Sequence, residues 1–459
     1  MSHQTPPASQ TSSSGEKNAQ AAADPIVSDT PSAASAVPVS APPSGALTSK
    51  QWLQILSTFI VFFNTWGLLL TFGVFQTYYA QVLLPSHSSS SISWISTTCA
   101  FIILSAGIVT GPLYDCGFYA VLLLSGSLLQ VLGLMMLSIS TQYYQLFLCQ
   151  AICVGLGAGI VFTPSVAAAA ACLTSPAIRA KAMGLMACGS SIGGIIYPIM
   201  FRTLVSRTGF PWAVRAIGFV TLGLYLVSYL VLINRPKKPA MARRIFDASA
   251  FTDLPFMVLS VASLFSATAY YIPLLYLPLL AKIRIPHVQP HLASDLLAIL
   301  NGASVVGRLI SGVVAAKYGP TETISISLVM GSILLFCWIV VDTVTGMIVW
   351  SVFWGMISGV LVALPGAFIP LFCPSLAVIG TRSGMYWAWV GAGLLIGSPI
   401  GGAIYDVKAG KSDWWRLQVF AGVFMMGAAV LTVYPILHLR RKRRVETQES
   451  TVDLPALVA

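Results

Sequence analysis

Long stretches of this chain carry no charged side chain. No Asp, Glu, Lys or Arg occurs between Lys50 and Asp115, between Asp115 and Arg179, or between Asp342 and Arg382. A helix that crosses a bilayer needs about 20 apolar residues, so stretches of this length hold whole crossings. Alternating strands of a membrane barrel do not produce such continuous apolar runs. The stretches therefore predict membrane-spanning helices, because lipid offers no hydrogen-bond partner to an open backbone.

The overall composition agrees with this interpretation. Only 8% of the residues are charged, whereas a soluble domain carries about 25%. The net charge is +11, but the cations lie in short loops and tails, which favours a bilayer and no nucleic acid as partner. The eight cysteines lie within or beside apolar stretches and form no Cys-x-x-Cys pair. We therefore expect no cofactor and no metal site.

The apolar stretches divide into twelve predicted spans. These cover roughly 52–79, 93–113, 118–139, 144–172, 182–206, 212–233, 254–280, 292–316, 323–341, 343–370, 383–405 and 414–438. The predicted fold class is an all-α membrane protein with twelve transmembrane helices in two pseudo-symmetric six-helix bundles. The expected domains are a disordered cytoplasmic tail at 1–48, an N-terminal bundle at 49–234, a cytoplasmic central loop at 235–253, a C-terminal bundle at 254–438 and a basic cytoplasmic tail at 439–459.

The distribution of Lys and Arg predicts the orientation. Both residue types are more frequent in the segments that are cytoplasmic if the N-terminus is inside, including the central loop and the run Arg440–Arg444. Positively charged loops stay on the cytoplasmic side of a membrane. We therefore expect a multi-pass protein of the cell membrane with both termini in the cytoplasm. Three arginines of one outer loop depart from this bias: Arg202, Arg207 and Arg215.

The two halves of the chain share a pattern of landmarks. Three residues recur 201 positions later: Gly111 as Gly312, Pro164 as Pro365, and Pro198 as Pro399. The Gly-rich fourth and fifth predicted spans correspond in order to the tenth and eleventh. Two related six-helix halves form a transporter architecture. In that architecture a central cavity lies between the halves, and rocking of the halves exposes it to each side in turn.

Several segments resemble a known family. They are "TFGVFQTYY" (71–79), "SWISTTCAFIILSAGIVTGPLYD" (93–115), "FLCQAICVGLGAGIVFTPS" (147–165), "AKAMGLMACGSSIGGIIYPIM" (180–200), "NGASVVGRLISG" (301–312) and "GTRSGMYWAWVGAGLLIGSPIGGAIYD" (380–406). Together they resemble the major facilitator superfamily and, within it, the fungal branch of the monocarboxylate porter family. The resemblance covers about 52–438. It implies a twelve-helix transporter that works by alternating access.

The sequence departs from that family at three places, one of which is the loop after Asp115, where the superfamily's basic residues are missing. Where transporters of lactate-like acids carry an aspartate four residues before the arginine of span eight, this chain has Ser304 before Arg308. Where they carry a lysine in span one, it has Val74. The resemblance therefore implies fold and transport, but it does not imply proton-coupled uptake of a simple monocarboxylate.

Arg308 is the sharpest candidate for substrate binding. It lies within predicted span eight, roughly 12 Å from the cytoplasmic end at about 1.5 Å per residue. A central arginine costs about 2.5–3.5 kcal/mol on insertion scales. That cost is explained if the guanidinium faces a wet cavity and holds a carboxylate or enolate through two parallel hydrogen bonds. The alternative is a structural arginine bonded to carbonyls, or one that extends toward the cytoplasm.

Other polar and aromatic residues complete the candidate sites. Those that we expect to line the cavity, with packing or an interfacial position as the alternative, are Asn64, Thr71, Tyr270, Tyr271, Asn301 and Trp387. The resemblance implies a gating role for Asp115, which sits where the superfamily's loop motif has its carboxylate. Arg179 and Arg382 are its expected partners on the same membrane side.

These observations predict a transporter of a small organic solute rather than an enzyme. A carboxylate-like or acidic secondary metabolite is the expected cargo, with export favoured over import and no oligomer required. The alternatives are an uptake permease for a monocarboxylate or vitamin and, from another class, a transport-dead sensor or a membrane enzyme. A sensor usually adds a long cytoplasmic domain, and an enzyme needs a reactive constellation that the sequence does not offer.

Overall fold

The computed structural model describes residues 47–173, 176–234, 247–285, 292–374, 379–404 and 414–452. Within these ranges every regular element is helical. The predicted tail at 1–48 lies outside them except for its last two residues, and the central loop is described only from Asp247 onward. Eleven of the described helical segments are long and apolar enough to cross a membrane.

The first half of the chain consists of twelve consecutive elements, several of which join end to end into longer helices. They are α1 (Ser49–Phe62), η1 (Phe63–Gly67), α2 (Leu68–Tyr78), η2 (Tyr79–Leu83), α3 (Ser89–Ser105), α4 (Gly107–Asp115), α5 (Tyr119–Leu137), α6 (Tyr143–Leu146), η3 (Phe147–Val154), α7 (Gly155–Cys172), α8 (Pro176–Ser228) and η4 (Tyr229–Asn234). The first crossing begins at a capping box, in which the Thr48 side chain accepts from the Gln51 backbone and the Gln51 side chain accepts in return. The segments η1, η2 and η3 are π-helical turns within longer helices.

The second half repeats the helical pattern. Its elements are η5 (Ala248–Phe251), α9 (Leu254–Arg284), α10 (Leu292–Tyr318), α11 (Pro320–Cys337), η6 (Trp338–Val340), α12 (Val344–Ala363), α13 (Pro365–Phe368), η7 (Ile369–Phe372), α14 (Ile379–Ile404) and α15 (Trp414–Val452). The helix α15 continues well past 438, where the predicted span ends, because residues 439–452 contain no Gly or Pro and many good helix formers. Part of the predicted basic tail is therefore helical.

One helix of the first half accounts for two predicted spans. The candidate span Ala182–Val231 has 50 residues and would be about 75 Å long if straight, more than twice the roughly 30 Å apolar layer of a bilayer. It is broken at Gly209, whose φ of 79° and ψ of 170° are not helical. Only glycine adopts such a φ without strain, and Pro211 follows it. The predicted spans 182–206 and 212–233 lie on the two sides of this break.

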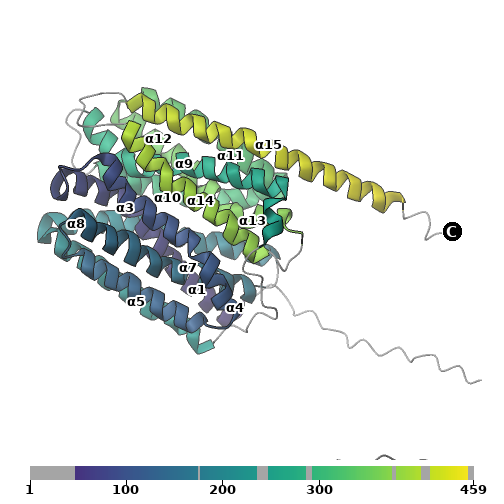
Figure 1. The fold of residues 1–459 in the computed structure, drawn as a ribbon, viewed down its shortest axis with the longest axis horizontal. Coiled ribbons are helices and arrows are strands. Elements are labelled where there is room, and N and C mark those ends of the chain that lie inside the picture. The colour runs from purple at the N-terminus through teal and green to yellow at the C-terminus, as the bar shows by residue number, and fades with distance from the viewer. Residues whose placement is uncertain are drawn as a thin grey trace, which may run out of the picture. The chain divides into compact units, whose positions relative to one another are not determined.

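The helices of the two halves meet mainly along three pairs. The helix α3 packs against α14, α8 against α10, and α2 against α9. Figure 1 shows the purple-to-blue helices of the first half gathered beside the green-to-yellow helices of the second. The contact is close: a Cβ atom added at Gly73 would lie 2.3 Å from the Leu274 backbone oxygen. Such glycines bring helix backbones together in membrane proteins.

The two ends of the helical bundle can be defined from the chain. The tail end is where α1 and α9 begin, and α15 projects beyond the other helices there (Figure 1). The far end is where η2 and α9 finish. Large apolar side chains face outward around the bundle, including Val109 at 64% and Val313 at 72% exposure. An apolar outer surface on this scale fits a protein solvated by lipid, so the chain is a multi-pass membrane protein.

Candidate functional site

An aromatic cavity lies mainly among the helices of the second half. It contains about 680 Å³ of empty space, open solvent at its mouth included. Its wall is formed by α9, α11, α12, α13, α14 and α15, and a single residue of the first half, Trp66, also lines it. The large side chains of the wall are Trp66, Tyr270, Phe368, Tyr386 and Trp387. Tyr270 and Trp387 are two of the residues predicted to bind substrate.

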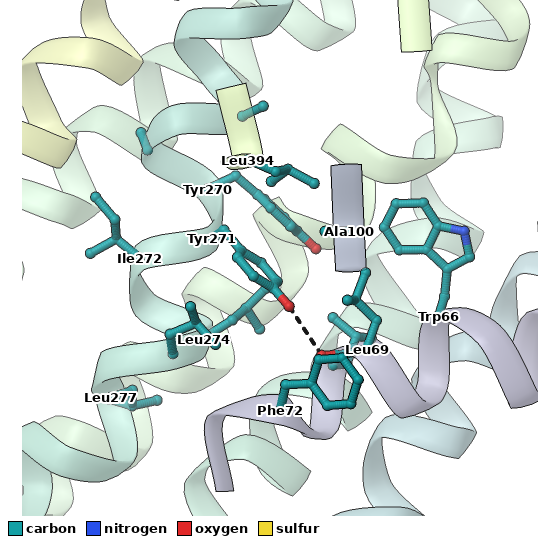
Figure 2. Close-up of a cluster of buried hydrophobic side chains, with 14 of the residues drawn as sticks. Trp66, Leu69, Phe72, Ala100, Tyr270, Tyr271, Ile272, Leu274, Leu277 and Leu394 are labelled. Atoms are coloured by element: carbon teal, nitrogen blue, oxygen red, sulfur yellow. Dashed lines mark hydrogen bonds between the residues drawn. The ribbon is translucent and has the colours of Figure 1, made fainter. Parts of the chain in front are cut away.

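This position differs from the expected one. The sequence predicted a cavity between the halves, whereas the cavity described here is enclosed by the second half and reaches the first half only at Trp66. The reason is the close approach of the halves themselves, as at Gly73, which leaves little room between them. Figure 2 shows Tyr270 extending from α9 toward the side on which Trp66 lies.

The chemistry of the cavity is apolar with a few hydroxyl and indole groups. Ser263 and Ser266 line it, but their hydroxyls donate to the Ser260 backbone oxygen (2.7 Å) and the Met425 sulfur (3.8 Å). No Asp, Glu, Lys or Arg is among its lining residues. Tyr270 lies on α9, which packs against α10, the helix that carries Arg308. The cavity thus suits an apolar, planar solute and offers no carboxylate to attract a cation.

Arg308 is buried where the halves meet. Its side chain is 2% exposed, and one terminal nitrogen donates to both the Ala187 backbone oxygen and the Ser190 hydroxyl of α8. Its Nε has no hydrogen-bond partner, and among the described residues no carboxylate forms an ion pair with it. The arginine therefore takes the carbonyl-bonded geometry that the sequence left open as the alternative, and it does not line the cavity.

Two more residues of α10 contact α8 on the same side as Arg308. The Asn301 amide donates to the Gly194 backbone oxygen (3.1 Å) and to its own helix at Leu297 (2.9 Å). Ser304, at the position where the resemblance would place an aspartate, accepts from the Ser191 hydroxyl at 3.3 Å. We call these contacts the α8–α10 seam, formed by Asn301, Ser304 and Arg308 with Ala187, Ser190, Ser191 and Gly194.

Asn64 and Thr71 of the first crossing, which we expected to line the cavity, form hydrogen bonds inside the first half. Asn64 donates to the Thr221 backbone oxygen (3.2 Å) and accepts from the Tyr197 hydroxyl (2.8 Å). Thr71 donates to the Gly67 backbone oxygen of its own helix at 2.8 Å. Both side chains are fully buried, and neither lines the cavity. The Asn64 side chain thus holds the first crossing against α8, whereas the Thr71 hydrogen bond stays within the first crossing.

Tyr271 lies next to Tyr270 in the chain but serves a different contact. Its hydroxyl donates to the Leu69 backbone oxygen of α2 at 3.2 Å, as the dashed line in Figure 2 shows. Tyr271 therefore joins α9 to the first half. Of the residues predicted to bind substrate, only Tyr270 and Trp387 line the cavity.

The predicted gating residues are only partly described. The side chains of Asp115 and Arg179 lie outside the described part of the structure, although Asp115 closes helix α4. Arg382 is described, and its side chain is 2% exposed. It forms ion pairs with Asp247 (3.0 Å) and Asp253 (2.5 Å). The gating assignment of these three residues remains a prediction.

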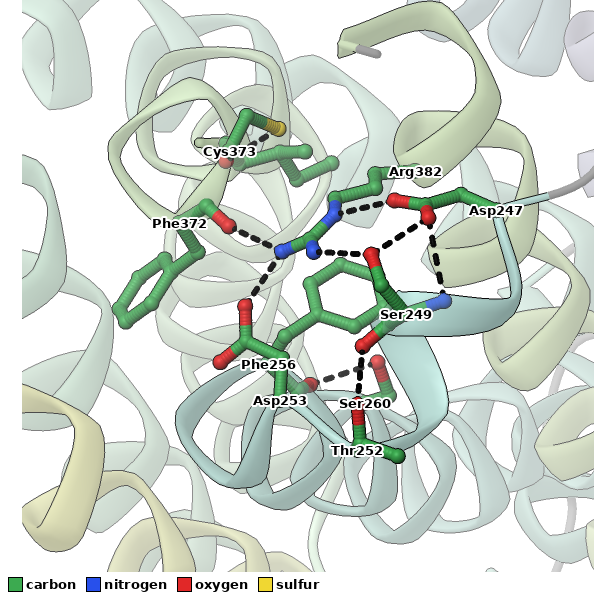
Figure 3. Close-up of polar contacts among 10 residues, drawn as sticks. Asp247, Ser249, Thr252, Asp253, Phe256, Ser260, Phe372, Cys373 and Arg382 are labelled. Carbon is green, nitrogen blue, oxygen red and sulfur yellow. Dashed lines mark hydrogen bonds and ion pairs between the residues drawn. The ribbon is translucent and has the colours of Figure 1, made fainter. Parts of the chain in front are cut away.

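The Arg382 cluster lies wholly within the second half (Figure 3). The guanidinium also donates to the Phe372 backbone oxygen at 2.7 Å and lies 5.2 Å from the centre of the Phe256 ring. Hydrogen bonds from Ser249 and the nearby arginine hold the pKa of the Asp247 carboxyl below its usual value. The sequence analysis did not single out these two aspartates, although Asp253 directly precedes the seventh span and Asp247 precedes the short helix η5, positions that are typical of helix N-termini.

Burial also affects a neighbouring thiol. Cys373 follows η7, beside the Arg382 cluster, and burial raises the pKa of its thiol to about 11. The thiol is therefore protonated at neutral pH and donates to the Ile369 backbone oxygen at 3.4 Å. A protonated thiol is a poor nucleophile and a poor metal ligand.

Comparison with known proteins identifies the family. Residues 54–285 match the model of the Major Facilitator Superfamily. An MFS-type transporter of Emericella nidulans is 40% identical over 83% of this chain and 84% of its own length. The aspyridones efflux protein of the same species is 35% identical over 83% of this chain and 77% of its own length. The fujikurins efflux protein of Gibberella fujikuroi is 33% identical over 87% and 85%, respectively.

These relationships cover most of the chain and agree with the helical architecture described above. The resemblance to the superfamily is confirmed, whereas none of the matches separates out the monocarboxylate porter branch. The chain belongs to the major facilitator superfamily and is a membrane transporter of that family.

Proposed function

We propose that this protein exports a bulky, acidic secondary metabolite across the cell membrane by alternating access. The observation that carries the proposal is the aromatic cavity itself: its lining residues include no carboxylate, and Tyr270 in its wall belongs to α9, which packs against α10, the helix of Arg308. Such a site suits a planar apolar anion, since aromatic side chains supply contact area and the arginine supplies charge complementarity. Two relatives are named for efflux of aspyridones and of fujikurins, which favours export.

The proposed topology has twelve crossings and cytoplasmic termini. The break at Gly209 supports counting the 50-residue segment as two crossings, which raises eleven to twelve. An even number agrees with the position of α1's start and α15's end, both at the tail end of the bundle. The run Arg440–Arg444 lies at that end, which favours the cytoplasm there.

In this proposal Arg308 changes partners during transport. In the present arrangement the guanidinium is occupied by α8 of the other half, and the halves must separate at this seam when they rock. A buried charge cannot be left without a partner at small cost, so the acidic group of the solute is a suitable replacement. Asp115, Arg179 and Arg382 keep their proposed role in closing the tail end.

The proposal is tested by metabolite profiling of a deletion strain and of complemented strains. Deletion is expected to retain an acidic aromatic metabolite inside the cells, and the wild-type gene is expected to restore its release. Arg308→Ala, with membrane expression verified, is expected to restore no release. Lys50→Ala, an exposed cation at the tail end, is the matched control and is expected to restore it fully.

Two outcomes contradict the proposal. Normal release by Arg308→Ala removes the arginine from the mechanism. Depletion of an external solute that stops on deletion, with no internal accumulation, replaces export by uptake.

A further inference from the structure

The cavity has a single described contact with the first half of the protein. Every lining residue except Trp66 belongs to α9 or a later helix. The Trp66 ring packs edge-on against Phe162 of its own half, with ring centres 5.8 Å apart, and Trp66 also lines the cavity. Its indole nitrogen is buried without a hydrogen-bond partner. In this arrangement, Trp66 is where an occupant of the cavity touches the first half.

Trp66 stands on a backbone that is fixed to the first half. It belongs to the π-helical turn Phe63–Gly67; π-helical turns inside α-helices are frequent at functional sites. The Asn64 backbone oxygen in this turn accepts from the Gln130 side chain at 2.7 Å. The Asn64 side chain is held by Tyr197. Asn64 thus ties this turn to α5 through Gln130 and to α8 through Tyr197.

The same turn touches α8 without a side chain in between. A Cβ atom added at Gly67 would lie 2.7 Å from the Gly193 Cα, and one added at Gly193 would lie 2.6 Å from the Phe63 backbone oxygen. The next residue, Gly194, is equally tight against α10: an added Cβ would lie 2.8 Å from Asn301 Cγ. The residues that connect the cavity to the α8–α10 seam are therefore closely packed, so a shift of one displaces the next.

We propose that Trp66 is a positioning residue that couples the cavity to the α8–α10 seam. Displacement of the indole by an occupant shifts the turn Phe63–Gly67. Because Gly67 and Gly193 are in direct contact, this shift moves Gly194 against Asn301 and biases the seam toward opening. The inference rests on the proposed function, since it assigns a mechanical role to the solute's contact with Trp66.

The test is a double-mutant cycle read on the empty, full-length protein in lipid nanodiscs. Spin labels carried by noncanonical amino acids replace Val82 and Val340, which are 56% and 77% exposed at the far end of each half. Pulsed electron paramagnetic resonance measures the distance between the two labels. The ratio of the molecules with a short distance to those with a long one, the population ratio, then reports how often the far end is closed. The cycle combines Trp66→Phe with Gly194→Ala, and coupled residues give a non-additive result.

The matched control is Gly184→Ala on the same helix. A Cβ atom at Gly184 meets nothing within 4 Å. We expect Trp66→Phe to change the effect of Gly194→Ala on the population ratio by about threefold or more. We expect it to leave the effect of Gly184→Ala on that ratio unchanged. If both cycles are additive, or both show the same coupling, the proposal is wrong.

A second variant protects the test against misfolding. If Gly194→Ala does not fold, Asn301→Ala replaces it, because it breaks the same contact and adds no atoms; the same non-additivity with Trp66→Phe is expected, and additivity again overturns the proposal. The measurement involves no solute. It can therefore fail while export is verified, and it can succeed if the cargo proves to be of another class.

Discussion

Two buried arginines of the second half contrast sharply. Arg382 and Arg308 are each 2% exposed. Arg382 has two carboxylates, a backbone oxygen and an aromatic ring around it, all from its own half. Arg308 has one backbone oxygen and one hydroxyl, both from the other half, and its Nε lacks a partner. Equal burial thus hides a large difference in how well each charge is compensated.

The difference separates a structural charge from a mobile one. The Arg382 cluster can keep its ion pairs through any motion of one half against the other, because every member moves together. The contacts of Arg308 cross the interface between the two halves. They must therefore break when the halves rock into the other state of the transport cycle. An incompletely paired charge at such a line is available to a ligand. We therefore expect the Arg382 cluster to stabilise the second half, in addition to the proposed gating role of Arg382, and we expect Arg308 to act in transport.

Removal of Arg382 is expected to have the largest effect on stability. Arg382→Ala leaves Asp247 and Asp253 without their cation, and breaking a buried pair costs roughly 3–5 kcal/mol. We expect a loss of about 3 kcal/mol, the lower end, because the Asp253 side chain is 30% exposed. Thermal unfolding in detergent checks this, with Arg308→Ala as the matched variant. Equal losses of stability in the two variants would break the comparison.

Exchange of Arg308 for lysine is expected to affect transport more than stability. Arg308→Lys keeps the charge but removes the planar fork that pairs with a carboxylate. We expect release of the metabolite to fall about tenfold, corresponding to one charged hydrogen bond of about 1.5 kcal/mol. Export from complemented cells, corrected for membrane expression, checks this. Full export by Arg308→Lys would show that the positive charge alone is sufficient and that the planar guanidinium geometry is not needed to bind the solute.

Acid is expected to weaken the Arg382 cluster and to leave Arg308 charged. The pKa of Asp247 is lowered in the folded protein, so the unfolded chain binds its proton more readily. The stability that Asp247 contributes is therefore fully present above its ordinary pKa of about 4 and is lost as pH falls below that value.

This pH dependence is checked by thermal unfolding from pH 7 down to pH 3. The midpoint is expected to drop more for the wild type than for Asp247→Asn, in which the carboxyl cannot titrate. An identical acid profile in the two proteins would show that Asp247 is not paired as Figure 3 shows.

Sequence patterns were sufficient for the helices because lipid imposes strong rules. Charge-free stretches predicted the crossings, and the boundaries differ by a few residues, as for the first span, predicted at 52–79 and found at Ser49–Leu83. The break at Gly209 was anticipated as a loop, yet helix continues on both sides, since a single glycine with positive φ turns the chain.

The site was less predictable because residue type does not show partners. Arg308 was identified because an arginine within a membrane-spanning helix costs free energy of insertion. Its hydrogen bonds to Ala187 and Ser190 could not be predicted, because they depend on how α8 packs against α10. Asn64 and Thr71 share a helical face, yet their polar groups are used within the first half. Trp66 lies between them, and only the three-dimensional structure shows that it alone reaches the cavity from that half.

The smallest expected effect separates two adjacent tyrosines. Tyr270→Phe removes a phenol hydroxyl from the wall of the cavity, and we expect the apparent affinity for the exported solute to fall about threefold, the value of one ordinary hydrogen bond. Tyr271→Phe removes a bond to Leu69 that joins the halves, so we expect it to change the maximal rate of export and not the affinity. Transport into inverted membrane vesicles at several concentrations of the metabolite identified by profiling measures both quantities. If Tyr270→Phe changes only the rate, the acidic group of the solute does not bind beside Tyr270. The role of Arg308 in transport is then supported only by its contacts in the α8–α10 seam.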